Sequence, residues 1–126
     1  MPVITCIEDL KRLHRKRTPK MFWDYCESGS YTEQTFHENS SDFAKIRFRQ
    51  RVARDLTGRS LESTMIGRPV AMPVALAPVG STGMQHPDGE ILAARAAAKF
   101  GVPFTLSTMS ICSIEDVAAH SPEPFW

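Results

Sequence analysis

One stretch of the sequence, residues 72–107, limits the possible folds more than any other. A short apolar run at residues 74–77 is followed by a loop with two glycines, an alanine-rich segment and a second apolar run at residues 104–106. An unbroken apolar run of this length is typical of a strand buried on both faces, and alanine-rich segments favour helix. The stretch therefore predicts a strand, a loop, a helix and a second strand.

The two ends of the predicted helix carry signals of their own. Asp88 precedes the helix with a side-chain oxygen suited to capping free N–H groups, and Glu90 adds negative charge to the first turn. Gly101 is a typical helix-ending residue, and Pro103 follows two positions later. Strands joined through a helix pair in parallel with a right-handed crossover. We therefore predict an α/β fold, either an open sheet or a barrel.

Parallel α/β units carry their sites at the carboxyl ends of the strands. Here those ends are residues 78–81 and 107–109, which offer backbone N–H groups, carbonyls and hydroxyls but no strong acid, base or metal ligand. The four histidines are scattered, and no two have metal-ligand spacing. We therefore expect this edge to hold a polar planar ligand rather than to transfer protons, and we assign no catalytic or metal-binding residue.

The residues before this stretch predict helices. Thr5 and Glu8 have the spacing of a capping box at the start of a helix over residues 6–16. Thr18 and Pro19 fit a second start, as N-cap and first helical residue. A third helix is expected to begin at Ser30 or Thr32. Tyr25 lies on the second of these helices, where the pattern alone is that of a core aromatic.

Two further elements are expected between the helices and the first buried strand. Residues 45–52 alternate between apolar and basic side chains, which indicates an extended segment. Its basic row is compatible with phosphate or nucleic acid, but the net charge of +1 favours a solvated face, so no nucleic-acid partner is expected. Residues 67–69 predict the turn of a hairpin. After the second buried strand, Ser113 has N-cap spacing before another helix.

The predicted organisation has three parts. They are a helical cap with an extended segment at residues 1–58, a hairpin at 59–72, and two β/α units at 73–126. Two parallel strands do not close a sheet, and we expect the chain to be the N-terminal piece of a longer protein. The N-terminus lacks the apolar core of a signal peptide, and three scattered cysteines without a CxxC pair favour a reducing, cytoplasmic location.

Four segments of the sequence resemble FMN-dependent 2-hydroxy acid dehydrogenases. They are PKMFWDYCESGSYTEQTFHEN, RQR, MPVALAPVGSTGMQHPDGE and FTLSTMSICSIEDVA, in the family's order. Within this family, which includes glycolate oxidase, the VALAPVG and PFTLST segments are most similar to bacterial respiratory L-lactate dehydrogenases. The resemblance implies the N-terminal portion of a (β/α)8 TIM barrel, with preceding helices and a β-hairpin, in an oxidoreductase that passes electrons from an L-2-hydroxy acid to FMN.

The resemblance also implies roles for individual residues. Tyr25 would bind the substrate carboxylate, Pro78, Val79 and Gly80 would lie along the flavin ring, and Ser107 would bond the isoalloxazine edge. The proton-accepting histidine and the carboxylate-binding arginines of the family lie further along its sequences than this chain extends. Many members have Thr-Ala-Met where this chain has Val79-Gly80-Ser81, and tryptophan at Met109, which leaves the substrate side chain open between lactate, glycolate and another 2-hydroxy acid.

The resemblance further implies a homo-oligomeric whole enzyme, with a peripheral contact to the cytoplasmic face of the inner membrane or to the respiratory chain as an open possibility. A different class of function is a truncated, non-catalytic chain that acts at most as a binding or interaction module. The unpaired strands and the apolar C-terminus weigh against that alternative.

Overall fold

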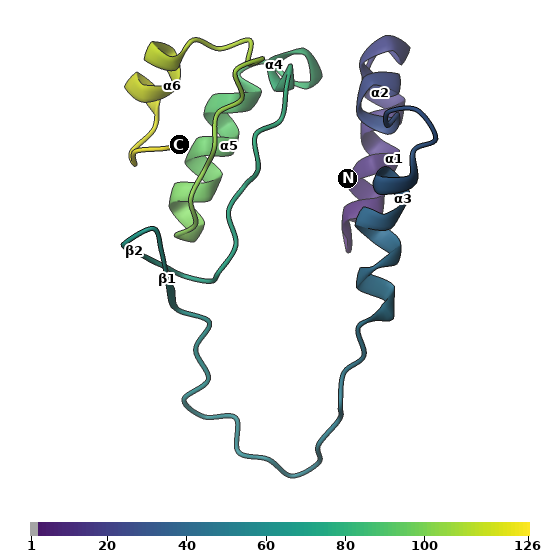
Figure 1. Cartoon of the computed structure of the whole chain (residues 1–126). Coiled ribbons are helices and arrows are strands. Elements are labelled where there is room, and N and C mark those ends of the chain that lie inside the picture. The colour runs from purple at the N-terminus through teal and green to yellow at the C-terminus, as the bar shows by residue number, and fades with distance from the viewer. Residues whose placement is uncertain (1–2) are drawn as a thin grey trace. The chain divides into compact units, whose positions relative to one another are not determined.

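The computed structural model describes residues 3–126. These residues form two compact units, one ending at Leu56 and the other spanning Thr57–Trp126. Figure 1 shows a helical first unit and a second unit that holds both strands. Each unit is described by itself.

The first unit consists of short helices. These are α1 (Ile7–Arg17), α2 (Lys20–Glu27), α3 (Gln34–Ser41) and the 3-10 turn η1 (Phe43–Lys45). Trp23 of α2 packs on α1, with its ring centroid 5.3 Å from that of His14 and the Lys11 ammonium 6.0 Å away over the ring. Lys11 also forms an ion pair with Glu27. The two helices are therefore joined by an aromatic contact and a charge pair.

Three of the predicted helix starts are shifted in the structure. The capping box at Thr5 and Glu8 is wrong: Cys6 is the N-cap of α1, and the Thr5 N–H and hydroxyl both donate to Asp9 Oδ2, at 3.0 and 2.8 Å. The reason is that the helix begins one residue later, so Asp9 is its third residue. The second helix has Pro19 as its N-cap and begins at Lys20, so Thr18 is not its cap and Pro19 is not its first residue. The third helix begins at Gln34 instead of near Ser30 or Thr32, after a left-handed Glu33.

The extended segment predicted at residues 45–52 forms no strand. Lys45 ends η1, and residues 46–62 are irregular and exposed along their whole length. A period-two pattern needs a neighbouring strand to pair with, and none lies beside this segment within its described unit. The basic side chains of this segment face solvent.

The hairpin is confirmed with its turn one residue earlier than predicted. Strands β1 (Ser63–Met65) and β2 (Arg68–Val70) are antiparallel, with Ser63 opposite Val70. Ile66 and Gly67 both have positive φ, at +47° and +74°. Two consecutive positive φ values are those of the hairpin turn whose twist matches the flanking strands. Arg68 and Pro69 therefore belong to β2 and not to the turn.

The predicted pair of parallel strands is reduced to a single bridge. Leu76 pairs in parallel with Phe104, through Leu76 N–H to the Pro103 carbonyl at 2.9 Å and Thr105 N–H to the Leu76 carbonyl at 3.1 Å. Residues 74–77 and 104–106 are therefore extended and correctly paired, but one bridge is too short to form a named strand.

A third segment joins this pair. Trp126 N–H donates to the Phe104 carbonyl at 3.0 Å, and Leu106 N–H donates to the Trp126 carbonyl at 2.8 Å. This is the hydrogen-bond pattern of a parallel bridge. The segments at Leu76, at Phe104–Leu106 and at Trp126 therefore lie side by side in chain order, which is the arrangement of successive strands in a parallel barrel.

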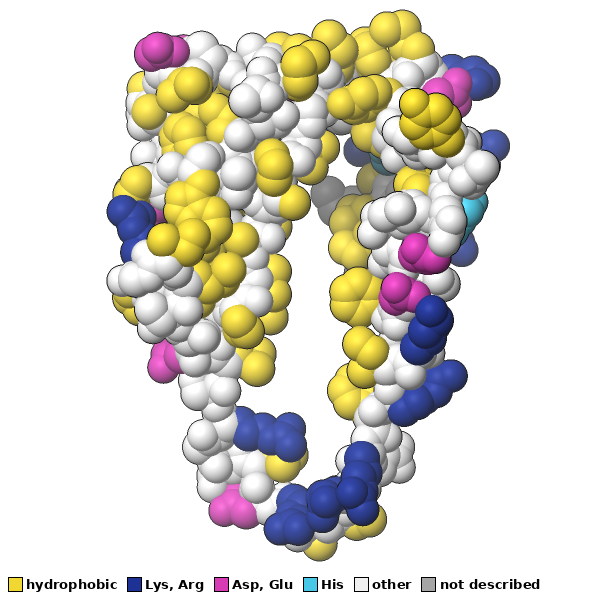
Figure 2. All heavy atoms as spheres, in the orientation of Figure 1, with side chains coloured by type: hydrophobic (Ala, Val, Ile, Leu, Met, Phe, Trp, Pro, Cys, Tyr) yellow, Lys and Arg dark blue, Asp and Glu magenta, His cyan; other side chains and the backbone are white. Residues whose placement is uncertain are grey.

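The helices α4 (Thr82–Gln85), α5 (Gly89–Phe100) and α6 (Ile114–His120) complete the second unit. As predicted, Ser113 caps α6 by accepting the Asp116 N–H at 3.0 Å. The core contains one buried side chain of α6, one of the second paired segment and three of α5: Val117, Phe104, Ile91, Ala94 and Ala97. Figure 2 shows that hydrophobic side chains also gather on an exposed face of this unit.

Gly101 is predicted to be costly to replace. Its φ is +80°, its N–H bonds the Ala97 and Ala98 carbonyls as the cap of α5, and an added Cβ would lie 3.2 Å from the Ala71 Cβ. Gly101→Ala should lower the free energy of unfolding by about 1–2 kcal/mol, because a side chain disfavours left-handed backbone. Urea denaturation measures the loss.

Gly58→Ala is the matched control for this substitution. Gly58 has a similar φ of +78°, but nothing lies within 4 Å of the position of its added Cβ. Equal losses in the two variants would show that the contact between Gly101 and Ala71 contributes nothing.

Candidate functional site

Two loops follow the paired segments of the second unit, at residues 78–83 and 107–111, and the first of them ends in the opening residues of α4. A backbone hydrogen bond from Ser81 N–H to the Met109 carbonyl joins them at 2.8 Å. The structure thereby brings together the loop with Pro78, Val79 and Gly80 and the loop with Ser107. The carboxyl ends of parallel segments are where α/β folds bind ligands.

The first loop presents two unpaired backbone donors. Among residues 3–126, no protein acceptor bonds the N–H of Val79 or of Gly80. Val79 is exposed and Gly80 half-buried, whereas Pro78 has no N–H to offer. The Thr82 hydroxyl donates to the Val79 carbonyl at 3.0 Å, a hydrogen bond that restrains the backbone of the loop. The loop is therefore suited to donate to the acceptor atoms of a ligand.

Ser107 offers a hydroxyl at the second loop. Its Oγ accepts the Met109 N–H at 3.1 Å, and its carbonyl accepts the Ser110 N–H at 3.1 Å. The side chain is half-buried, and its hydroxyl hydrogen has no acceptor within the described residues. Ser107 is therefore held in place by its own loop and keeps one donor for a ligand.

Glu90 is the residue of this region that the sequence prediction missed. It was expected only to add charge to the first turn of α5, but its side chain is 1% exposed. Its Oε1 accepts the N–H of Gly83 at 2.9 Å and the N–H of Ile111 at 3.0 Å. One carboxylate on the helix therefore bonds both loops. An acidic residue is ordinary in the first turn of a helix, so the sequence held no signal for this role.

Asp88, in contrast, does not cap α5 as predicted. It lies at the N-cap position with a left-handed φ of +55°, and its side chain makes no capping hydrogen bond. A capping side chain normally requires extended backbone at this residue, which explains the difference.

Glu90 makes the stability of this region depend on pH. Burial is the largest single effect and raises the pKa of this carboxyl. The hydrogen bonds that the carboxylate accepts, first those from the N–H groups of Ile111 and Gly83, together outweigh burial, so the pKa lies below the usual 4.5. Because the folded pKa is depressed, the stabilisation is present above 4.5 and is lost as the pH falls below it. The free energy of unfolding should therefore fall less steeply below pH 4.5 in Glu90→Gln than in the wild type. Parallel slopes would contradict this prediction.

Tyr25 lies on α2 in the first unit and is 54% exposed. That exposure does not fit the interpretation of Tyr25 as a core aromatic. Its hydroxyl is available to a ligand in this unit.

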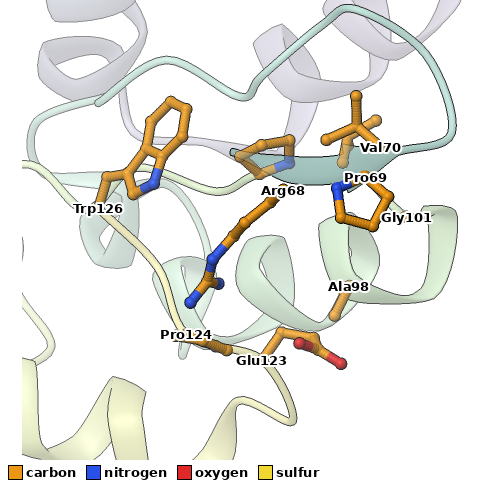
Figure 3. Close-up of a pocket in the computed structure, with 10 residues that line it drawn as sticks. Arg68, Pro69, Val70, Ala98, Gly101, Glu123, Pro124 and Trp126 are labelled. Carbon is orange, nitrogen blue, oxygen red and sulfur yellow. The ribbon is translucent and has the colours of Figure 1, made fainter. Parts of the chain in front are cut away.

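The second unit also has a hollow beside the hairpin, shown in Figure 3. It has a volume of about 460 Å³ and lies between β2, the end of α5 and the last residues of the chain. The Arg68 side chain extends from β2 toward Pro124. Pro103 lines this hollow at the start of the second paired segment, whereas Ser107 follows that segment, so none of the predicted site residues belongs to it.

Comparison with known proteins gives a family match over most of the chain. The model of the FMN-dependent dehydrogenase family matches residues 14–126. This chain belongs to that family. The family resemblance predicted from the sequence is thereby confirmed.

Curated relatives are named L-lactate dehydrogenase. The one from Chromohalobacter salexigens is 46% identical over 124 residues, and the one from Xanthomonas campestris pv. campestris is 47% identical; in both cases the match covers 98% of this chain and 32% of the relative. This member of the FMN-dependent dehydrogenases thus spans about a third of the length of the curated relatives it matches.

A solved structure gives the fold. The monotopic membrane protein (S)-mandelate dehydrogenase is similar with a TM-score of 0.90 and 38% identity, over 99% of this chain and 34% of that one. The chain is therefore part of the TIM-barrel fold of these enzymes. Among residues 3–126, no helix combines the length and the apolar character needed to cross a membrane.

Proposed function

We propose that this chain is the N-terminal third of an FMN-dependent dehydrogenase that oxidises L-lactate to pyruvate. The observation that carries the proposal is the 44–47% identity to proteins named L-lactate dehydrogenase over 98% of the chain. In this proposal residues 73–126 are the first two β/α units of the barrel, and the proton-accepting histidine belongs to the remainder of the enzyme.

The two loops fit the polar edge of a flavin. The unpaired N–H groups of Val79 and Gly80 match ring acceptors such as N5 and O4, Pro78 supplies an apolar contact, and Ser107 supplies a hydroxyl donor. When bound, FMN supplies the two-electron acceptor of the reaction. The residues of this chain hold and orient it, and Tyr25 binds the substrate carboxylate.

The activity is tested in a chimera in which residues 1–126 replace the matching third of the Chromohalobacter salexigens enzyme. The chimera supplies the remaining two thirds of the barrel. We expect it to bind FMN and to reduce a dye acceptor with L-lactate faster than with glycolate. No FMN binding by a folded chimera would refute the proposal.

(S)-Mandelate is the second candidate substrate. It is favoured by the solved structures, which are described as mandelate dehydrogenases and oxidases at 36–39% identity. A higher kcat/KM of the chimera for (S)-mandelate than for L-lactate would select this substrate and leave the flavin chemistry unchanged.

Ser107→Ala should weaken FMN binding by the chimera about fivefold, the equivalent of one lost hydrogen bond of about 1 kcal/mol. Quenching of FMN fluorescence on titration measures the affinity. Ser121→Ala is the control, because Ser121 follows α6 and its hydroxyl bonds the Glu123 carbonyl. The same affinity in both variants would remove Ser107 from the site.

We also propose where the whole enzyme acts and with what. It would be a homo-oligomer in the cytoplasm, attached peripherally to the inner membrane, a location supported by the monotopic mandelate dehydrogenase. Sedimentation of the full enzyme with inner-membrane vesicles tests the attachment. The alternative is that residues 1–126 act alone as a binding or interaction module. In that case the chain by itself should be soluble and should unfold cooperatively, which circular dichroism during thermal unfolding would show.

A further inference from the structure

The side chain of Glu90 occupies an unusual position between two loops that belong to different parts of the sequence. Its Oε1 bonds the N–H of Gly83, seven residues before it, and the N–H of Ile111, 21 residues after it. These N–H groups lie at the far ends of the two loops that carry Val79, Gly80 and Ser107. A single oxygen atom therefore sets the distance between the loops at that end.

The element that carries this oxygen is fixed in the core. Helix α5 buries Ile91, Ala94 and Ala97 in the core cluster of the second unit. Its first residue, Gly89, packs so closely on the loop that an added Cβ would lie 2.7 Å from the Thr82 carbonyl oxygen. Glu90 thus anchors both loops to a helix that is packed in the core. The loops are also joined directly, by the backbone hydrogen bond from Ser81 N–H to the Met109 carbonyl.

The space around the carboxylate is filled. A Cβ added at Gly83 would lie 2.7 Å from the Ile111 Cβ and 3.0 Å from Glu90 Oε2. The two loops and the carboxylate therefore fit together only while residue 83 is a glycine. The distance between the two loops is therefore set by this close fit as well as by the charge of Glu90.

From these contacts we propose that Glu90 is a positioning residue for the flavin. It holds the loop with Val79 and Gly80 and the loop with Ser107 at the separation that FMN requires, without touching FMN itself. The inference rests on the proposed function, and it goes further by assigning FMN affinity to a buried residue outside the ring contacts. A ligand held by several fixed groups loses affinity when the groups shift relative to one another.

The experiment uses the chimera with three substitutions at this contact. Glu90→Ala removes the acceptor of both N–H groups. Glu90→Gln keeps an oxygen at the Oε1 position, removes the charge and puts an amide NH2 in place of the buried Oε2. Gly83→Ala keeps the carboxylate and forces the loops apart, so the question remains answerable if Glu90→Ala fails to fold.

Glu115→Ala is the matched control. Glu115 is the second residue of α6, as Glu90 is the second residue of α5, but it is exposed. The two glutamates therefore have the same place relative to the helix dipole and differ in what they bond.

We expect Glu90→Ala and Gly83→Ala to raise the Kd for FMN about tenfold or more and to change the visible circular dichroism of bound flavin. Glu90→Gln and Glu115→Ala should stay within about threefold of the wild type, on the scale of one weak hydrogen bond. At saturating FMN the KM for L-lactate should be unchanged, because the proposed carboxylate contact is Tyr25 and not this pair of loops.

Three results would overturn the inference. One is an unchanged FMN affinity and flavin spectrum in folded Glu90→Ala and Gly83→Ala variants of a chimera that binds FMN, which would leave the proposed function standing. The second is a folded wild-type chimera that binds no FMN, which would refute both the proposed function and the role of Glu90. Loss of thermal stability in Glu90→Ala with normal flavin properties after refolding would also refute positioning, because Glu90 would then be purely structural.

Discussion

Val117→Asp should destabilise the second unit more than any other single substitution considered. Val117 is fully buried, at 0% exposure, among Ile91, Ala94 and Phe104. A carboxylate at this position would be enclosed by the apolar side chains of the core cluster. An uncompensated buried charge costs about 3–5 kcal/mol, which is a large fraction of the roughly 5–15 kcal/mol by which an ordinary domain is stable. Thermal unfolding of the chimera, followed by circular dichroism, measures the loss.

Ile114→Asp is the control for this prediction. Ile114 lies on the same helix, α6, but is 66% exposed. The same substitution should cost less than about 0.5 kcal/mol there, as is usual for exposed sites. A Val117→Asp variant that unfolds at the same temperature as Ile114→Asp would show that α6 is not part of the core.

Tyr25→Phe should raise the KM for L-lactate roughly 10- to 100-fold, the range of a lost hydrogen bond to a charged group. The substitution removes only the hydroxyl, and the exposure of Tyr25 makes a loss of stability small. FMN affinity should not change, because the groups proposed to hold FMN lie in the other unit. Steady-state kinetics of the chimera with L-lactate, together with FMN titration, measure both effects.

Tyr31→Phe provides the matched control. Tyr31 belongs to the same unit as Tyr25 and is fully exposed. If both substitutions leave the KM for L-lactate unchanged, then Tyr25 does not bind the substrate carboxylate. If both raise the KM, the effect belongs to the unit and not to one hydroxyl.

The sequence predicted most of the second unit because its signals there are local. Gly101 ends α5, Ser113 caps α6, and the apolar run at residues 74–77 pairs with the run at residues 104–106. The two helix ends depend on a few neighbouring residues and on the backbone preferences of glycine and serine. The two apolar runs are each local, and the helix between them is what predicts that they pair in parallel. The length of the strands was overestimated, because a strand is defined by its partners and only one bridge forms between these segments.

The role of Glu90 was beyond the reach of such signals. Its two partners, Gly83 and Ile111, are separated from it by a loop on one side and by a helix and a paired segment on the other. Only the folded chain brings their N–H groups to one oxygen. The alternation at residues 45–52 predicted an extended segment, and the described structure places no strand beside it, so the segment stays irregular.

The exposed stretch at residues 46–62 lies between the segment with the proposed substrate contact and the segment with the proposed cofactor contacts. The hydroxyl proposed to meet the substrate is encoded before it, and the groups proposed to hold the cofactor are encoded after it. A recombination joint within this stretch would cut no helix, strand or core contact of either unit. Exchange of the preceding segment between relatives would thus replace the residue proposed to bind the substrate carboxylate, while the groups proposed to hold the cofactor stay unchanged.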